Sequence, residues 1–372
     1  MSTSYQTCSR CIMDSTDPDI VFDEHGVCNH CYRYDDQVRR RTFPAAERQG
    51  RLDALVARIK EQGKRKPYDC VIGVSGGVDS TYVAYLTKQL GLRPLAVHFD
   101  NGWDSEFAVA NIEKTLDRLS IDLYTYVVDW EEFKDLQLSF LKASTPDGEV
   151  PTDHAIVALL YRMAAKYGVK HILLGTNVAS EAIMPIKWGY GYSDYRYIKG
   201  VQRQFGSRKL KSYPHYTLPK LFEYMVLRRI KIVPILDYVD YRKEVAIKII
   251  QDEFDWKDYG GKHHESVYTR FYQSYILPRK FNIDKRRAHN ANLLLSGQIT
   301  RSEALQGLEA PAYHEMAMQE ELEYVIKKLG ITEEEFERLM ELPVQTFFDY
   351  SSNYKTLSQV KYFMGRRKAE KA

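Results

Sequence analysis

Two patterns of apolar residues alternate along the middle of the chain. Continuous apolar runs that are typical of buried strands occupy residues 68–75, 93–100, 122–128, 169–176 and 231–236. Between them, the spacing of apolar residues predicts amphipathic helices at residues 78–90, 105–119 and 152–167. This alternation predicts an α/β fold, a doubly wound, parallel, five-stranded sheet with helices on both faces and ligands at the carboxyl ends of its strands.

The segments around this region differ in composition, so we expect four units. They are a cysteine-rich knot at residues 1–35, a basic helical linker at 36–66, the α/β domain at 67–236, and a helical domain for substrate or partner at 237–372. Residues 184–218 are rich in glycine and tyrosine, and we expect them to form an irregular insertion that covers the substrate. The last unit has helical spacing without strands and includes helices at residues 315–329 and 333–341.

Four of the five cysteines lie near the N-terminus, as two CxxC pairs separated by sixteen residues: Cys8, Cys11, Cys28 and Cys31. Each pair can hold one cation from a tight turn, and four thiolates complete a tetrahedral Zn²⁺ shell without an open position. We therefore expect a structural zinc, with His25 and His30 outside its ligand shell. Disulfides are the alternative, but a reducing compartment disfavours them.

The segment between the first predicted strand and the first predicted helix has the composition of a phosphate-binding loop. It consists of Ser75, Gly76, Gly77, Val78, Asp79 and Ser80. Glycines let backbone amides approach a phosphate closely, and a helix N-terminus adds N–H groups and a positive dipole end. The two serine hydroxyls can donate to phosphate oxygens, and Asp79 fits the site if Mg²⁺ lies between it and the phosphates.

Composition and charge bear on whether the protein enters a membrane, is exported or binds nucleic acid. Hydrophobic residues make up 44% and charged residues 28% of the 372-residue chain, and no apolar run is long enough to cross a membrane. The N-terminus lacks the features of an export signal, so we expect a cytoplasmic protein. The net charge of +3 is too small to indicate a nucleic-acid partner by itself, and the basic segments at residues 39–66 and 355–371 are interpreted as solvated surface.

The loop resembles the PP-loop of ATP pyrophosphatases, a superfamily whose members cleave ATP between its α and β phosphates. The sequence lacks the GxxxxGK[ST] and GxGxxG motifs of other nucleotide-binding loops. Two further segments resemble the adenosine-holding parts of that superfamily. They follow the second and fourth predicted strands and contain Asp100, Asn101 and Gly102, and Gly175, Thr176 and Asn177.

Five segments together resemble the N-acetyl sugar amidotransferase family, of the WbpG and PseA type. They are the cysteine-rich N-terminus, SGGVDS, SEAIMPIKWGYGYSDYRYIKG, GGKHHESVYTRFYQSYILPRKFNIDKRRAH and SGQITRSEAL. The resemblance implies that an acetamido group of a nucleotide-activated sugar becomes acetamidino, with ATP and ammonia, in bacterial surface-polysaccharide biosynthesis. It also implies substrate roles at Glu181, Trp188, Asp194, Lys262, Glu265, Arg270, Lys280 and Arg286.

Catalysis in this scheme needs few side chains. We expect Ser75, Asp79 and Ser80 to act on the phosphates, and the adjacent His263 and His264 to bind substrate or transfer protons. Glutamine hydrolysis would need a nucleophilic thiolate or a comparable residue with an activating base. The remaining cysteine, Cys70, lies inside an apolar run, where a cysteine is most often a small buried hydrophobic residue. The sequence therefore predicts that the chain lacks a glutaminase of its own. The family resemblance implies that a separate glutaminase, with a cyclase-like partner that conducts ammonia, supplies the nitrogen.

Two other classes of protein remain as alternatives. A tRNA-thiolating PP-loop enzyme can also carry a zinc knot before its loop, but such enzymes generally need additional reactive cysteines, and here only Cys70 is left. A zinc-knot binding module with a degenerate nucleotide fold would leave the intact phosphate loop unexplained. The sequence does not distinguish among possible sugars, acetamido positions, or UDP and CMP carriers.

Overall fold

The computed structural model describes residues 5–260, 264–309 and 315–354. Its centre is one five-stranded sheet in the order β3-β2-β1-β4-β5, with every neighbouring pair parallel. The strands are β1 (Cys70–Gly73), β2 (Pro94–Asp100), β3 (Asp122–Val127), β4 (His171–Leu174) and β5 (Lys231–Pro234). The predicted parallel sheet is confirmed, and β1 lies at its centre, so the loop that follows β1 opens at the middle of the carboxyl edge.

The strand pattern separates the two faces of the sheet. Val71 packs into one hydrophobic cluster, with residues of the two helices that lie between β3 and β4. Its neighbours Cys70 and Ile72 pack into another, with residues of the helix before β1 and of the helices that follow β1 and β2. Because successive side chains of a strand point to opposite faces, this apolar run buries both sides of the sheet, as a doubly wound fold requires.

Helices connect the strands and cover them. Around the first four strands lie α2 (Ala45–Gly63), α3 (Val78–Gln89), α4 (Glu106–Leu119), α5 (Trp130–Ala143) and α6 (Val150–Lys166). Between β4 and β5 lie α7 (Val178–Glu181), η1 (Ile186–Trp188), α8 (Tyr195–Phe205), α9 (Leu218–Phe222) and the turn η2 (Glu223–Leu227). The N-terminus of α6 lies at the same edge of the sheet as the loop after β1, because Thr152 near the start of α6 accepts a hydrogen bond from Asn101, the residue that follows β2.

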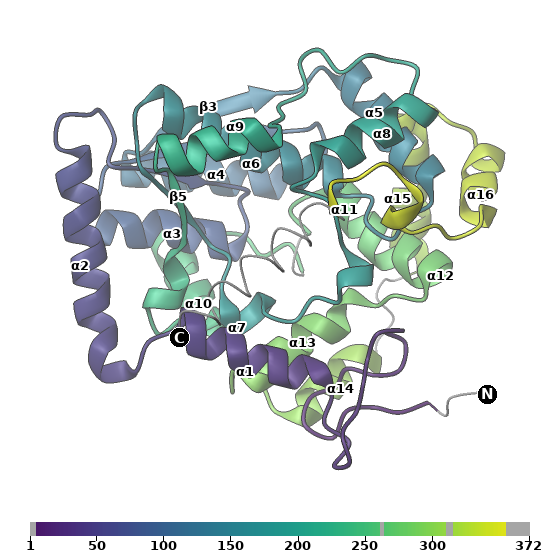
Figure 1. The fold of residues 1–372 in the computed structure, drawn as a ribbon, viewed down its shortest axis with the longest axis horizontal. Coiled ribbons are helices and arrows are strands. Elements are labelled where there is room, and N and C mark those ends of the chain that lie inside the picture. The colour runs from purple at the N-terminus through teal and green to yellow at the C-terminus, as the bar shows by residue number, and fades with distance from the viewer. Residues whose placement is uncertain (1–4, 261–263, 310–314, 355–372) are drawn as a thin grey trace, which may run out of the picture.

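The region after β5 is helical, as predicted. It contains η3 (Ile235–Tyr238), α10 (Lys243–Phe254), α11 (Val267–Phe271), η4 (Tyr272–Ile276), α12 (Leu277–Phe281), α13 (Lys285–Leu295), α14 (Arg301–Glu309), α15 (Glu315–Leu329), α16 (Glu333–Glu341) and η5 (Phe347–Asp349). Figure 1 shows α15 and α16 beside α5, and α13 and α14 beside the N-terminal helix α1 (Asn29–Arg41). The C-terminal helices therefore border both the sheet domain and the cysteine-rich segment.

The expectation of an irregular segment at residues 184–218 is wrong for its centre, because α8 forms there. The Asp194 side chain caps this helix and accepts hydrogen bonds from the backbone N–H groups of Arg196 and Tyr197. Tyr197, Ile198 and Val201 form the buried face of α8, which lies against α5. An N-terminal cap and one apolar face are sufficient to order a segment that contains many glycines and tyrosines.

Within the described residues, no helix is both long enough and apolar enough to span a membrane.

Candidate active site and metal centre

The loop after β1 has the backbone shape of an anion cradle. Gly76 has φ +76°, and a Cβ atom there would lie 2.4 Å from the Ala108 carbonyl oxygen in the first turn of α4. Only glycine fits both the left-handed conformation and the contact. Gly77 is the N-cap of α3, so the first N–H groups of this helix face the loop, where an anion is favoured.

The two predicted serines meet above this cradle. Their hydroxyl oxygens lie 3.3 Å apart, and the Ser75 backbone N–H donates to Ser80 Oγ at 3.2 Å. The Gly77 N–H in turn donates to Ser75 Oγ at 3.3 Å. Both hydroxyls therefore lie where they can donate to phosphate oxygens bound by the loop.

Glu265 reaches the phosphate loop from the C-terminal region. Its backbone carbonyl accepts a hydrogen bond from the Ser105 N–H at 2.8 Å, and the Val267 N–H donates to the Trp103 carbonyl at 2.8 Å. This short antiparallel pairing fixes residues 265–267 beside the end of β2. As a result, Glu265 Oε1 accepts a hydrogen bond from the Ser75 hydroxyl at 3.4 Å.

Asp79 and Glu265 place two carboxylates around the loop. The Tyr241 hydroxyl donates to Asp79, and a Cβ atom on Gly77 would meet the Tyr259 hydroxyl at 3.1 Å and Glu265 Oε1 at 3.3 Å. Burial, followed by the negative charges of Glu265 and Asp79, raises the pKa of Tyr259. Carboxylate oxygens beside a phosphate cradle are the donor set that Mg²⁺ prefers, so the residues present fit a magnesium–nucleotide complex.

The residues predicted at two other strand ends lie at this same edge. Asn101 Nδ2 donates to Thr152 Oγ1 at 3.3 Å, and its Oδ1 accepts from the Trp103 N–H at 3.1 Å. Asp100 accepts from the N–H of Gly102, which has φ +81°. After β4, Asn177 caps α7, Thr176 is exposed, and a Cβ atom on Gly175 would touch the Asp79 backbone at 3.0 Å. An adenosine role for these residues remains a prediction.

Several side chains predicted to bind substrate have local partners. Arg270 pairs with Glu321 on α15, and Lys280 donates to the carbonyl groups of Leu339 and Met340. Burial lowers the pKa of Lys280 to about 8. Arg286 forms an ion pair with Asp284, the N-cap of α13, at 2.7 Å. These contacts show that Arg270, Lys280 and Arg286 each stabilise the fold locally. Their roles in substrate binding stay predictions.

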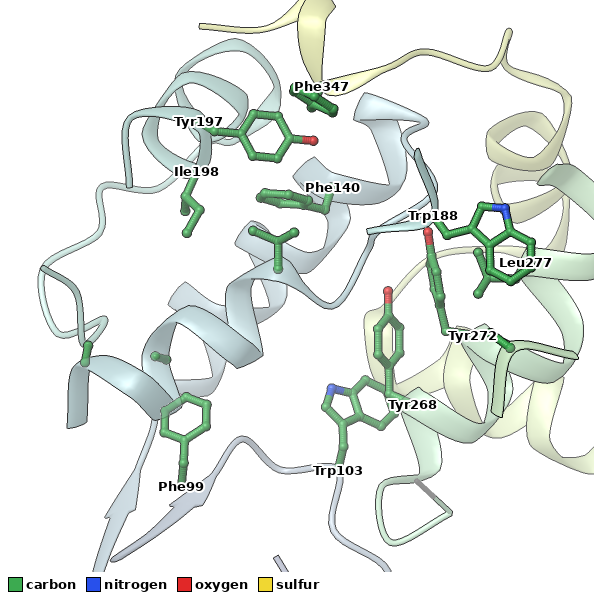
Figure 2. Close-up of a cluster of buried hydrophobic side chains, with 14 of the residues drawn as sticks. Phe99, Trp103, Phe140, Trp188, Tyr197, Ile198, Tyr268, Tyr272, Leu277 and Phe347 are labelled. Carbon is green, nitrogen blue, oxygen red and sulfur yellow. The ribbon is translucent and has the colours of Figure 1, made fainter. Parts of the chain in front are cut away.

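The remaining predicted residues differ in how deeply they are buried. Glu181 ends α7 and is half-buried. Trp188 and Asp194 are buried, and Figure 2 shows the Trp188 ring beside Leu277. His264 is half-buried next to Glu265. Lys262 and His263 lie outside the described residues.

The sequence analysis missed residues that the fold brings to the loop. Trp256 Nε1 donates to the Gly76 carbonyl at 2.9 Å, and Tyr241 and Tyr259 border Asp79. Trp256 and Tyr259 come just before the GGKHH segment, so their position in the sequence could have predicted that they lie near the site. Tyr241 is 162 positions from Asp79, and no local pattern connects the two.

The four N-terminal cysteines form a compact, fully buried cluster. The Sγ atoms of Cys8 and Cys31, of Cys11 and Cys28, and of Cys28 and Cys31 lie 3.8, 3.6 and 3.8 Å apart. A tetrahedral zinc with Zn–S bonds of about 2.3 Å would place its sulfurs about 3.8 Å from one another. All four Sγ atoms lie within 4.8 Å of one another, so the cluster can hold one such ion.

Groups around the cysteines complete this metal centre. The backbone N–H groups of Cys28 and Cys11 point at Cys8 Sγ, at 3.2 and 3.4 Å, which stabilises a thiolate. His30 is not in the cluster, because its Nε2 lies 2.6 Å from buried Asp17 Oδ2. Arg301 of α14 donates to the carbonyl groups of Cys8 and Cys11, which connects the centre to the C-terminal helices.

The sheet and the loop after β1 have the PP-loop, NAD synthetase-like fold, and residues 51–214 match the family model of NAD synthase. Residues 265–361 match the model "LPS biosynthesis protein WbpG-like, C-terminal domain". The chain thus joins a PP-loop domain to a WbpG-like C-terminal domain, as the sequence motifs predict. The matched C-terminal segment begins at Glu265, the residue that reaches Ser75.

Two curated relatives each match about half of the chain or less. The chain is 25% identical over 200 residues to the tRNA-specific 2-thiouridylase MnmA 2 of Fusobacterium nucleatum, covering 51% of this chain and 53% of that protein. It is 24% identical over 163 residues to the MnmA of Petrotoga mobilis, covering 40% and 44%. The chain thus spans about half the length of the curated relatives it matches.

Solved structures resemble the chain only in part. An NH3-dependent NAD synthetase from Campylobacter jejuni is 16% identical, with 56% of this chain and 93% of that chain covered and a TM-score of 0.29. An NMN synthetase from Francisella tularensis is 18% identical, with 62% and 93% covered and a TM-score of 0.26.

Proposed function

We propose that this protein is an ATP-dependent amidotransferase that converts an acetamido group of a nucleotide-activated sugar to an acetamidino group with ammonia. The observation that carries the proposal is the contact between Ser75 of the phosphate loop and Glu265, the first residue of the WbpG-like segment. The description of that family supports a role in bacterial surface-polysaccharide biosynthesis.

The reaction proceeds in two balanced steps. The acetamido oxygen attacks the α-phosphorus of ATP, pyrophosphate leaves, and an imidate ester of AMP forms. Ammonia then adds to the imidate carbon, AMP leaves with the former amide oxygen, and one proton is released. Activation is needed because an amide oxygen is a poor leaving group, and the products are an amidine, AMP and pyrophosphate.

In this scheme, the chain's own residues position the phosphates and stabilise their negative charge. The Gly76–Gly77 backbone and the N-terminus of α3 bind the departing pyrophosphate, while Ser75 and Ser80 donate to its oxygens. Asp79 and Glu265 would hold Mg²⁺, which would supply positive charge to neutralise the phosphates. His264, next to Glu265, is a proposed substrate contact, as is the half-buried Glu181.

We further propose that zinc in the cysteine cluster is structural, because four thiolates leave it no open coordination position. Nitrogen arrives as ammonia from a separate glutaminase with an ammonia-conducting, cyclase-like partner. Cys70 is fully buried in β1, and burial raises the pKa of its thiol, which argues against a nucleophilic role.

Product analysis tests the proposal. The purified protein with ATP, Mg²⁺, ammonium and an N-acetylated nucleotide sugar should form AMP and pyrophosphate only when the sugar is present. Asp79→Ala should abolish AMP formation because it removes a proposed magnesium contact, while Asp117→Ala, an exposed change on α4, should not. Sugar-dependent formation of ADP and phosphate would refute the proposal.

A second candidate, tRNA thiolation, draws on the printed names of the curated relatives. It would need a thiol to carry sulfur, yet four cysteines form the metal cluster and Cys70 is buried. Sulfur incorporation into tRNA by the zinc-loaded protein would favour this candidate over the sugar amidotransferase.

A further inference from the structure

A second group of carboxylates lies near the phosphate loop, around the N-terminus of α6. Asp147 and Glu149 precede this helix, Glu149 is its N-cap, and Asp153 lies in its first turn. The Asp153 side chain is reached by solvent although protein atoms surround its carboxyl group, while Glu149 is 9% exposed. Burial, and after it the charges of Asp147 and Glu149, raise the pKa of Asp153 to about 8.

This acidic cluster, defined as Asp147, Glu149 and Asp153, belongs to the same edge of the sheet as the ATP loop. Thr152, beside Asp153, accepts a hydrogen bond from Asn101 at the end of β2. Glu181 acts electrostatically on Asp153 and also on Tyr241, which donates to Asp79 of the loop. Glu181 is therefore within electrostatic range of both the acidic cluster and the tyrosine that contacts the loop.

An independent observation indicates that the cluster has a ligand. Among the residues that the structure describes, none forms a hydrogen bond with the Tyr268 hydroxyl, although the residue is only 1% exposed. The negative charge of Glu149 acts on this phenol. Figure 2 shows Tyr268 and Tyr272 with their hydroxyls pointing the same way, and Tyr272 bonds the Thr145 carbonyl just before the cluster. A buried hydroxyl without a partner is costly unless a ligand completes it.

We propose that the acidic cluster and the Tyr268 hydroxyl bind ammonium, the nitrogen donor of the reaction. Ammonium is small and positive, and its N–H groups can be shared among carboxylate oxygens and the phenol oxygen. Mg²⁺ fits less well, because it prefers octahedral oxygen shells from carboxylates, phosphates and water, and a neutral phenol is a weak ligand. Lys285 already presents one alkylammonium charge to Asp147 and Asp153.

This inference rests on the proposed function for its chemical purpose. The Asp153 carboxylate takes one proton from ammonium, which leaves neutral ammonia with a free lone pair and a neutral Asp153 carboxyl. A base with a pKa near the working pH is suited to this transfer. The charged or titratable groups that act on Asp153, or on which it acts, are Asp147, Glu149, Glu181, Lys285, Tyr192 and Tyr213.

Ammonium binding can be measured without catalysis, from the thermal midpoint of the zinc-loaded protein near pH 8. Ammonium chloride should raise the midpoint above that in tetramethylammonium chloride of equal ionic strength, because a ligand of the folded state stabilises it. Tyr268→Phe, which removes only the unpartnered hydroxyl, and the double variant Glu149→Gln with Asp153→Asn should lose most of this rise. Glu113→Gln, an exposed change on α4, should keep it.

The same variants separate the two proposals. If AMP formation is detected, the KM for ammonium should increase about tenfold or more in the double variant, as for a lost hydrogen bond to a charged group, while the KM for ATP changes little. An unchanged ammonium-specific rise in both site variants would overturn the ammonium site, whatever the activity. A displacement of ammonium by Mg²⁺ at the cluster would also overturn it. If the rise disappears in the variants but no sugar supports AMP formation, the ammonium site stands and the sugar reaction fails.

Discussion

The Ser75 hydroxyl on the phosphate loop donates a hydrogen bond to Glu265 Oε1 at 3.4 Å. This contact brings together residues 190 positions apart and connects the PP-loop domain to the WbpG-like segment. If Glu265 helps to hold Mg²⁺ on the phosphates, Glu265→Gln should lower kcat for AMP formation about a hundredfold, the cost of losing one strong electrostatic contact at the reacting group.

The matched control for Glu265 is Glu337→Gln, an exposed carboxylate on α16 that should leave the rate unchanged. Rates are measured by AMP release at saturating ATP, with the Mg²⁺ dependence as a second readout. A Glu265→Gln enzyme with normal kcat and normal Mg²⁺ dependence would remove this residue from the site.

The metal centre provides a prediction about stability. The purified protein should contain about one zinc per chain, and Cys8→Ser should lose zinc and reduce the soluble yield. Arg301→Ala should keep the zinc but lower the free energy of unfolding by about 2 kcal/mol, because hydrogen bonds from a cation to the Cys8 and Cys11 carbonyls are lost.

Elemental analysis measures the zinc content of these variants, and denaturant titration measures their free energy of unfolding. Arg203→Ala, an exposed substitution on α8, is the control for Arg301. A native protein without zinc, or four freely titrating thiols, would contradict the structural-zinc proposal.

The positions of the five cysteines predict the source of the nitrogen. The isolated chain should use ammonium but not glutamine, because Cys70 is buried against α2 and α3 and the other four cysteines form the cluster. Cys70→Ala should retain activity and cost about 1 kcal/mol of stability. Glutamine-dependent turnover by the chain alone, lost in Cys70→Ala, would show that the thiol is a nucleophile after all.

Asp153 predicts a pH dependence of stability with a definite sign. Its pKa is raised to about 8 in the folded protein, against about 3.9 in an unfolded chain. Between those values the folded state binds the additional proton, so this residue's contribution to stability falls as pH rises and levels off above about 8.

Asp153→Asn removes this dependence, so the variant should gain thermal stability relative to the native protein as pH rises from about 4 to about 8. The difference between the two midpoints, measured at several pH values, isolates the residue from other titrating groups. An equal difference at every pH would mean that the pKa of Asp153 is not raised.

The sheet and the loop were predictable because their determinants are local. The apolar run at 68–75 and the two glycines that follow it specify a buried strand and a turn within a few residues. The CxxC spacing likewise specified the cysteine cluster, whose members the structure brings within 4.8 Å. Asp194 precedes an amphipathic segment, and an aspartate in that position is typical of a helix N-cap. This local pattern was sufficient to predict α8.

The site's long-range contacts could not be predicted in the same way. Glu265 reaches Ser75 only because residues 265–267 pair with the segment after β2, and that pairing leaves no pattern in either segment. The acidic cluster depends on the direction of α6, which brings Asp153 to the loop edge of the sheet. Carboxylates near a helix start are common as caps, so their composition alone does not indicate a ligand.

The fate of the acetamido oxygen shows whether this oxygen attacks the α-phosphorus of ATP. A nucleotide sugar with a heavy oxygen isotope in its acetamido carbonyl is incubated with the protein, ATP, Mg²⁺ and ammonium, and the products are weighed by mass spectrometry. The account predicts that the label appears in the phosphate of AMP and that the sugar gains NH in place of that oxygen. Label retained in the sugar, or found in inorganic phosphate alongside ADP, would contradict the account.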